Sequence, residues 1–261
     1  MRDLVEIALE AAAAAGEAVM SNYGKDLFVE DKLDGSPVTV ADTEAHQAIK
    51  EILAPLDLAI VSEEGKEVDQ ATERYWLVDP LDGTKDFLAR TGEFTINIAL
   101  VDQGSPILGV VFAPDKSDFF WGLSGAGAWR ILHGETERLA HVPALKELTM
   151  VSSKSENAEE LEGFMRMNNI VNSISVGSAL KYGLLAAAEC DVFPRLVGSS
   201  EWDTAAGQAV LEASGGAVVE WDTGTPLSYG KPLRRNPRLL SFRSPYEVTS
   251  FIRQQFGTDI S

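Results

Sequence analysis

The 261-residue sequence has a single cysteine, Cys190, few basic residues and no long apolar run. One cysteine excludes a disulfide within the chain and fits a reducing compartment, so we expect a cytoplasmic protein. No segment approaches the roughly 20 apolar residues of a membrane-spanning helix, and membrane association is therefore not indicated. The alanine-rich N-terminal stretch carries Glu6, Glu10 and Glu17 without a basic start, so we do not expect a signal peptide.

Basic residues are scarce relative to acidic ones. Lysine and arginine number 22 against 40 aspartates and glutamates, which gives a formal net charge of −18. This balance excludes a nucleic acid polymer bound through a basic face. A small anionic ligand stays compatible with it, because bound cations reverse the local field. The length suits one large domain or two sub-domains that share a core, and we expect a monomer or a homodimer.

The chain is organised around an apolar strand that runs into two acids. Residues 75–78 are the strand, and Asp79-Pro-Leu-Asp-Gly-Thr84 follows directly. Pro80 has no amide hydrogen, so we expect the strand to stop there. Asp79 and Asp82 are then two carboxylates at a strand end, and oxygen ligands of this kind suit a hard cation such as Mg²⁺. The alternative interpretation is a polar turn with unrelated acids.

The first part of the chain reads as two helices and an antiparallel sheet. Helical periodicity covers residues 4–20 and a second segment that follows Thr39 and ends at Pro55. Alternating patterns predict two hairpins, over residues 94–112 and 119–132. Asp42 lies in the first turn of the second helix, where the helix dipole alone would explain an acid.

The second part alternates strands with helices from about residue 148. The strands are predicted at 148–152, 170–176, 192 onward and 217–221, and the helices at 156–167, 178–188 and 201–211. Asp203 is the expected N-cap of the last helix. A change of composition near 134–147 divides the chain into an α+β sub-domain, 1–140, and an α/β sub-domain, 141–261.

Four separated segments resemble, in order, the inositol monophosphatase superfamily of metal-dependent phosphatases. They are Ser36-Pro-Val-Thr-Val-Ala-Asp42, Ser62-Glu-Glu64, Asp79-Pro-Leu-Asp-Gly-Thr84 and Glu201-Trp-Asp-Thr-Ala-Ala-Gly207. Within it, the bacterial 3′(2′),5′-bisphosphate nucleotidases are most similar, through Trp76 to Phe87, Gly92 to Leu100, Gly177 to Lys181, Asp191 to Arg195 and Asn236-Pro237. The resemblance covers almost the whole chain. It implies a mixed α/β, five-layer α-β-α-β-α sandwich of the inositol monophosphatase and fructose-1,6-bisphosphatase type.

The resemblance also implies a set of metal ligands. These are Glu63, Asp79, the Leu81 carbonyl, Asp82 and Asp203. Most of them fall in residues 1–140, and Asp203 is the last ligand, in residues 141–261. They would hold two Mg²⁺ ions and a weaker third one, which Li⁺ would displace. Each acid taken alone also has a plain alternative as an exposed loop residue.

A catalytic group for the attacking water is implied as well. Thr84 and Asp42 resemble the family's activating pair, since a threonine hydroxyl needs an acceptor behind it to help a water molecule react. Glu63 joins this group as a ligand of the weaker Mg²⁺. Glu64 joins it through water bound to the metal.

Substrate contacts carried over from the resemblance come mostly from the second half of the chain. They are Gly83, Thr84, Ser153, Gly177, Ser178, Lys181, Arg195, Glu201 and Asp203. Lys181 and Arg195 would hold the second, non-hydrolysed phosphate, although both also fit as surface cations. Glu156 stands where the family has a histidine. An acid there repels a phosphate unless it points away. We expect Lys181 and Arg195 to outweigh it, especially if Glu156 can swing into solvent on its helix start, and we expect Glu156→His to favour a bisphosphate.

The leading hypothesis is a Mg²⁺-dependent hydrolase that removes the 3′-phosphate of adenosine 3′,5′-bisphosphate, a by-product of sulfate activation in sulfur metabolism. Its sulfonated precursor is a further expected substrate. The alternative within the same class is a phosphatase for inositol phosphates, fructose 1,6-bisphosphate or another sugar or polyol phosphate. A non-catalytic metal or phosphate-binding module is the hypothesis from a different class, and it would have no use for Thr84 and Asp42 together.

Overall fold

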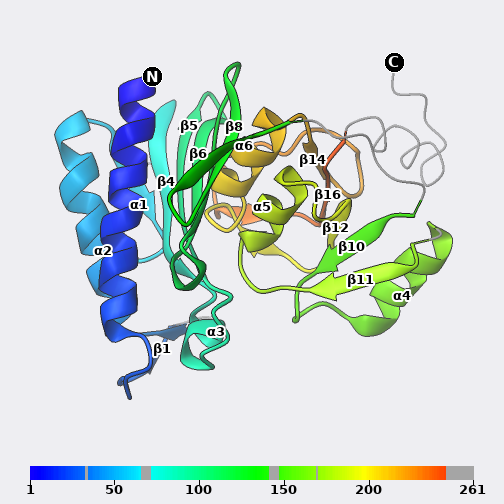
Figure 1. Ribbon diagram of the computed structural model, residues 1–261, viewed down its shortest axis with the longest axis horizontal. Helices are drawn as coiled ribbons and strands as arrows, with labels where there is room; N and C mark the ends of the chain where they lie inside the picture. Colours follow the sequence, from blue (N-terminus) through cyan, green and yellow to red (C-terminus); the bar gives the residue numbers. More distant parts are fainter. Residues whose placement is uncertain (33–34, 66–71, 141–146, 169, 245–261) are drawn as a thin grey trace.

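Helices and sheets alternate in five layers across the molecule, as Figure 1 shows for the computed structural model. The structure describes residues 1–32, 35–65, 72–140, 147–168 and 170–244. Helices α1 (Arg2–Asn22) and α2 (Val40–Leu53) form the first layer, and α5 (Leu180–Ala186) and α6 (Ala205–Ala213) form the middle one. Helix α4 (Ala158–Met167) lies on the far side. The expected five-layer α/β sandwich is confirmed.

The second layer is a seven-stranded sheet whose strands follow chain order. They are β3 (Ala59–Ser62), β4 (Arg74–Asp82), β5 (Thr95–Asp102), β6 (Ser105–Ala113), β7 (Asp118–Leu123), β8 (Gly127–Leu132) and β9 (Glu135–Leu139). Strands β3 and β4 run parallel, and every later neighbour is antiparallel. Both predicted hairpins are confirmed. The sequence did not reveal β9, because its first four residues are exposed and polar.

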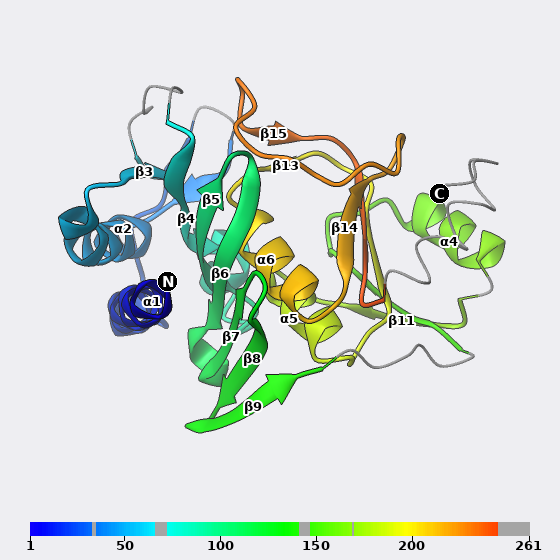
Figure 2. The same ribbon diagram turned by 90° about the horizontal axis from the view of Figure 1, so that it is seen from above.

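Burial on both faces of this sheet explains why β5 carries apolar side chains on both of its faces. Phe94, Ile96 and Ile98 pack with α1 and α2, whereas Ala99 and Val101 belong to the core on the opposite face. Figure 2 shows α1 and α2 on one side of the sheet and α5 and α6 on the other. A sheet covered on both faces has to be apolar on both.

The fourth layer is a five-stranded mixed sheet of order β11-β10-β12-β16-β14. The strands are β10 (Thr149–Ser152), β11 (Asn172–Ser175), β12 (Val192–Arg195), β14 (Ala217–Glu220) and β16 (Leu239–Phe242). Strand β16 lies between β12 and β14 and is antiparallel to both. The sequence analysis did not predict β16, because the described residues between β14 and β16 contain no helix, and the alternation of strands and helices that indicated the other strands gives no signal there.

Short elements complete the fold. The paired strands are β1 (Glu30–Asp31) with β2 (Pro37–Val38) and β13 (Ser199–Ser200) with β15 (Arg235–Asn236). The short helices are α3 (Thr84–Leu88), η1 (Ala54–Leu56) and η2 (Pro114–Lys116). Among the described residues, no helix combines the length and the apolar character needed to cross a bilayer.

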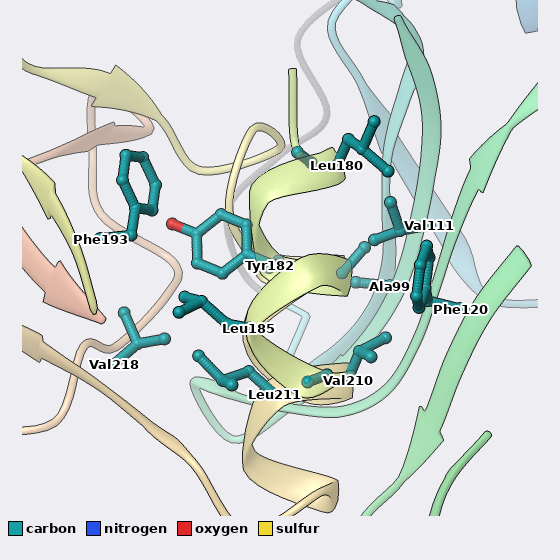
Figure 3. Packing of buried hydrophobic residues seen from close by; sticks show 14 of the residues in the cluster. Ala99, Val111, Phe120, Leu180, Tyr182, Leu185, Phe193, Val210, Leu211 and Val218 are labelled. Atoms are coloured by element: carbon teal, nitrogen blue, oxygen red, sulfur yellow. The ribbon is translucent and has the colours of Figure 1, made fainter. Parts of the chain in front are cut away.

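The middle layer is packed from both sides. In Figure 3, Tyr182 and Leu211 lie toward Phe193 and Val218 of the small sheet, and Val210 lies toward Phe120 of the large one. Two glycines of the large sheet allow α6 to come this close. A Cβ on Gly109 would meet the Ala206 carbonyl oxygen, and one on Gly122 would lie 2.7 Å from the Val210 Cα.

The middle layer also links the two halves of the sequence. Helix α6 comes from the second half, yet it packs against β5, β6 and β7 of the first. The predicted sub-domain boundary, between residues 140 and 141, adjoins 141–146, which lie outside the described residues. The division into 1–140 and 141–261 stays a prediction.

Candidate functional site

One cavity of about 630 Å³ collects most of the residues singled out from the sequence. It opens where β4, α5, β12 and the segment before α6 come together. Its lining includes Glu63, Asp79, Leu81, Asp82, Gly83, Thr84, Ser153, Gly177, Ser178, Lys181, Arg195 and Asp203. Asp42, Glu64 and Glu201 are not among the described residues that line it.

The two acids of the central motif are presented by a β-bulge. The expectation that the strand stops at Pro80 is wrong, because β4 continues to Asp82. Its register with β5 shifts between Asp79, which pairs with Asn97, and Asp82, which pairs with Thr95. Three residue steps on β4, from Asp79 to Asp82, therefore lie opposite two on β5. The extra residue lets the strand accommodate Pro80, which has no amide hydrogen to donate to the ladder. Both carboxylates remain at the rigid end of a buried strand.

Asp79 is buried, and Asp82 and Asp203 are half-buried. These three carboxylates, which we call the acidic cluster, lie close enough to affect one another's pKa values. Burial, followed by the charge of Glu63, raises the pKa of Asp79 well above its ordinary value. Burial likewise raises the pKa of Asp82, and it raises that of Asp203, with help from the charge of Asp82, to about 7. Several acids that converge in a cavity are costly to ionise unless cations join them.

Each member of the acidic cluster accepts a backbone hydrogen bond. Asp79 accepts from the Leu81 amide at 3.1 Å, Asp82 from the Ala179 amide at 2.6 Å and Asp203 from the Ser200 amide at 2.8 Å. In the part of the chain that the structure describes, no three acidic, histidine or cysteine side chains already surround one point where an ion could sit. The chemistry of the donors nevertheless fits a divalent cation, because buried, mutually repelling carboxylate oxygens are the ligands that Mg²⁺ prefers.

Asp203 reaches this cluster through the start of α6. That helix begins at Ala205 with Thr204 as its N-cap, so the prediction of Asp203 as the N-cap is wrong. The carboxylate instead bonds back to the Ser200 amide, before the helix starts. A short turn from Ser200 to Thr204 therefore holds Asp203 at the cavity wall.

Thr84 and Asp42 are in direct contact. The Thr84 hydroxyl donates to Asp42 Oδ1 at 3.0 Å and also lies 3.3 Å from the Leu81 carbonyl oxygen. Asp42 Oδ2 accepts from the amide and the hydroxyl of Thr39, both at 2.8 Å, in a capping box at the start of α2. Burial raises the pKa of Asp42. Asp42 therefore stands behind Thr84 and meets the cavity through it.

Glu63 and Glu64 share a lysine. Lys32 Nζ lies 2.7 Å from Glu63 Oε1 and also pairs with Glu64. Burial raises the pKa of Glu64, and Lys32 opposes the rise. Glu63 lines the cavity, whereas Glu64 faces Lys32 behind it.

Lys181 and Arg195, which we call the cationic pair, also face the cavity. Lys181 is 4% exposed, and its Nζ donates to the carbonyl oxygens of Val176, at 3.1 Å, and of Ser178. Burial lowers the pKa of Lys181 to about 8, and the charge of Arg195 contributes. Arg195 Nη1 donates to Ser153 Oγ at 2.7 Å. A buried lysine does not fit the alternative of a surface cation.

The expected phosphate-binding amides at residues 177 and 178 precede α5 rather than open it. The Gly177 amide donates to Glu93 Oε2 at 2.9 Å, so a protein carboxylate already takes it. A Cβ at Gly177 would lie 2.5 Å from the Glu93 carbonyl oxygen, which explains the glycine. Ser178 adopts a left-handed conformation with φ 52°.

Glu201 has a different environment from the other predicted substrate contacts. Its side chain is fully buried and ion-paired with Lys231 and Arg234. It also accepts the amides of Gly230 and Lys231 at 3.2 and 2.9 Å. Glu201 therefore fixes the loop that leads into β15.

Lys154, Asp86 and Glu93 form a link that the sequence analysis missed. Lys154 Nζ lies 2.6 Å from Asp86 Oδ1 and 2.8 Å from Glu93 Oε2. Lys154 and Asp86 both line the cavity. The sequence carried no signal for this pairing, since 68 positions separate the two residues.

Glu156 does not take the solvent-facing orientation that would have kept its charge away from a phosphate. Its side chain is 0% exposed and lies 3.4 Å from Arg195 Nη1. Helix α4 begins two residues later, and Asn157 caps it by accepting from Glu159 and Glu160. The acid is therefore drawn inward by Arg195.

Comparison with known proteins supports the resemblance seen in the motifs. A model of the inositol monophosphatase family matches residues 1–243. The 3′(2′),5′-bisphosphate nucleotidase CysQ of Shigella flexneri is 42% identical over 238 residues, 88% of this chain and 93% of that protein. The protein of that name from Salmonella typhimurium is 38% identical over 255 residues, 95% of this chain and all of that protein.

Solved structures agree in fold. CysQ from Bacteroides thetaiotaomicron, described as a bacterial member of the inositol monophosphatase family, superposes with a TM-score of 0.82 at 34% identity, covering 92% of this chain and 97% of that one. A Thermotoga maritima IMPase gives a TM-score of 0.78 at 26% identity, covering 97% of both chains. From the family model, from relatives that match nearly end to end and from the shared fold, this chain belongs to the inositol monophosphatase family.

Proposed function

We propose that this chain is a divalent-metal-dependent phosphatase that hydrolyses the 3′-phosphate of adenosine 3′,5′-bisphosphate, giving AMP and phosphate. The observation that carries the proposal is that one cavity joins the acidic cluster to the cationic pair. The acidic cluster could hold the metal that a phosphatase needs, and the cationic pair suits a second phosphate that is not hydrolysed. Two relatives, at 42% and 38% identity, carry the name of this activity.

The metal ligands would be Asp79, Asp82, Asp203, Glu63 and the Leu81 carbonyl. We propose that they hold two to three Mg²⁺ ions and that Li⁺ inhibits turnover by displacing the weakest of them. A divalent cation bound there supplies charge for phosphoryl oxygens and acidifies a water molecule. It would also remove the cost of ionising the acidic cluster, whose pKa values burial and mutual repulsion raise.

Thr84 and Asp42 would orient and deprotonate the attacking water. Because the Thr84 hydroxyl donates its hydrogen to Asp42, its oxygen can accept a hydrogen bond from water. Asp42 can receive the hydroxyl proton as Thr84 takes one from the water. Thr39 keeps the carboxylate aimed through two hydrogen bonds. The water then attacks phosphorus in line with the leaving oxygen.

The cationic pair would bind the 5′-phosphate, which is not hydrolysed. Arg195 presents fixed donors, and Lys181 is a point charge held by two carbonyl oxygens. A polyol monophosphate has no second phosphate to occupy these groups. The second candidate, a sugar or polyol phosphatase, rests on the fold shared with the Thermotoga maritima IMPase.

A phosphate-release assay with a substrate panel tests the proposal. The panel is adenosine 3′,5′-bisphosphate, its sulfonated precursor, inositol 1-phosphate and fructose 1,6-bisphosphate, each with Mg²⁺, with excess chelator and with Li⁺. We expect the highest kcat/KM for the adenosine bisphosphate, with AMP as the product by ³¹P NMR. Full turnover in chelator contradicts the metal, and a higher kcat/KM for inositol 1-phosphate contradicts the nucleotide. Cytoplasmic localisation and a monomeric or homodimeric state stay predictions.

A further inference from the structure

Glu156 is a buried carboxylate in an exposed turn. It lies between β10 and α4, next to the exposed Lys154 and Ser155 and the exposed first turn of α4. Its side chain nevertheless has 0% exposure. Burying a carboxylate is costly unless charged or hydrogen-bonding partners compensate it.

Among the described residues, the hydrogen-bond partners of the Glu156 carboxylate come from the end of β12 and the residues that follow. Oε1 lies 3.4 Å from Arg195 Nη1, and Oε2 accepts the Leu196 amide at 3.2 Å. The nearby Val197 amide also favours the ionised carboxylate. Burial raises the pKa of Glu156, while Arg195 and the two amides oppose the rise. One acid thus holds the backbone and the guanidinium of the same short segment.

The protein makes hydrogen bonds to one nitrogen of the Arg195 guanidinium, Nη1. Nη1 is shared by Ser153 Oγ, at 2.7 Å, and Glu156 Oε1. Among the residues that the structure describes, Nε and Nη2 have no hydrogen-bond partner, and the side chain is 20% exposed where it lines the cavity. A guanidinium has five donors in a fixed fork, so restraining Nη1 leaves the other donors for an anion.

We propose that Glu156 is a positioning residue that restrains Arg195, and thereby sets how tightly the cavity binds a second phosphate. This inference rests on the proposed function and names the residue that tunes its substrate choice. An unrestrained arginine would lose side-chain freedom on binding, which weakens binding by about two- to tenfold. Because Glu156 already restrains Arg195 in the free protein, less side-chain freedom is lost when the phosphate binds.

The opposite view is that Glu156 weakens anion binding through its negative charge. The two views predict opposite signs for the same substitution. If Glu156 positions Arg195, then its removal weakens binding of a phosphate. If Glu156 chiefly repels, then its removal tightens binding, as our earlier expectation for Glu156→His assumed.

The first measurement is AMP binding by calorimetry, because AMP keeps the 5′-phosphate and cannot be turned over. We expect E156Q and E156A to raise the Kd of AMP about tenfold. The KM for the bisphosphate should rise similarly while kcat changes less than about threefold, because Glu156 does not reach the reacting phosphoryl group. Glutamine keeps the size of the side chain, so E156Q reports on the contact if E156A unfolds. Exposed Glu160→Ala is the matched control and should change none of these values.

A double-mutant cycle then asks whether Glu156 acts through Arg195. R195A alone should weaken AMP binding, and E156Q added to R195A should weaken it little further. Tighter AMP binding in E156Q, or the same tenfold loss in the R195A background, overturns the inference.

The same data separate the inference from the proposed function. A wild type that hydrolyses the bisphosphate while E156Q binds AMP unchanged overturns the inference alone. A wild type that leaves the bisphosphate intact but binds AMP through Arg195 and Glu156 overturns the proposed function and supports the inference. A wild type that neither hydrolyses the bisphosphate nor binds AMP overturns both.

Discussion

The acidic cluster and the cationic pair share one cavity but differ in how the protein compensates their charge. Asp79, Asp82 and Asp203 receive backbone hydrogen bonds, yet burial and mutual repulsion still raise their pKa values. Lys181 and Arg195 are held by carbonyl, hydroxyl and carboxylate oxygens of the protein itself. The cluster thus needs an external cation to ionise fully, whereas the pair is ready to meet an anion.

This difference assigns the two groups to different parts of turnover. A group that serves the reacting phosphoryl should affect kcat for every substrate alike. A group that holds the remaining phosphate should affect KM for bisphosphates alone. Substitutions in each group therefore test whether the acidic cluster and the cationic pair act at different stages of turnover.

The largest effect is expected from Asp79→Asn. Losing a proposed metal ligand should cost several kcal/mol, so kcat with Mg²⁺ should fall by about 10⁴-fold or more on every substrate. The melting temperature in chelator should not fall, because the substitution removes a buried charge. Phosphate release and thermal melts provide the measurements, with the exposed Asp57→Asn as control. A loss confined to one substrate would break the comparison.

Thr84→Ala and Asp42→Asn should each lower kcat by roughly 10²–10⁴, the usual worth of positioned acid–base help. The double variant should be little worse than either single one, because the two side chains act as a unit. Asp42 also caps α2, so each variant needs a thermal melt to show that it is folded. Losses that multiply would mean that the two groups act separately.

Arg195→Ala should act on substrate choice. A charged hydrogen bond to phosphate is worth about 1.5–3 kcal/mol, so the KM for the adenosine bisphosphate should rise about 10- to 100-fold. The KM for inositol 1-phosphate should change less than about threefold. Exposed Arg166→Ala is the control, since Arg166 pairs only weakly with Glu162 on α4. An equal fall of kcat on both substrates would place Arg195 with the acidic cluster.

The smallest effect is a pH dependence of stability without metal. Burial raises the pKa of Asp203 to about 7 and raises those of Asp79 and Asp82. The folded protein then holds protons that the unfolded chain releases, so stability is greatest at low pH and is lost as pH rises through 7. In chelator we expect the melting temperature to be about 3–6 °C lower at pH 8 than at pH 5.

Added Mg²⁺ should reverse that trend, because it binds the ionised carboxylates. Asp203→Asn should flatten the pH dependence by removing one of the three titrating groups. Differential scanning fluorimetry at several pH values measures both. A chelated protein that is more stable at pH 8 would show that the acidic cluster is not strained by its own charge.

How much the sequence predicted depends on whether a residue lies in a recognisable motif. The acids of Asp79-Pro-Leu-Asp-Gly-Thr84 lie close together along the chain, and a local motif revealed them. Glu156 and Lys154 depend on partners dozens of positions away, Arg195 and Asp86, which no local pattern encodes. The apolar pattern predicted α1, α2 and the hairpins, because in each of them it persists over many residues. The sequence analysis missed β9, whose first four residues are exposed and polar, and β16, which follows β14 with no helix in the described residues between them.

The close approach of α6 to the large sheet has a consequence for how this protein can vary. Asp203 reaches the cavity just ahead of α6, and Gly109 and Gly122 set how near that helix lies to β6 and β7. Neither glycine is among the described residues that line the cavity. A single added methyl group at either position would nonetheless displace the helix, and a carboxylate with it. In a map of tolerated substitutions, these two positions would behave as part of the active site although they never meet a ligand.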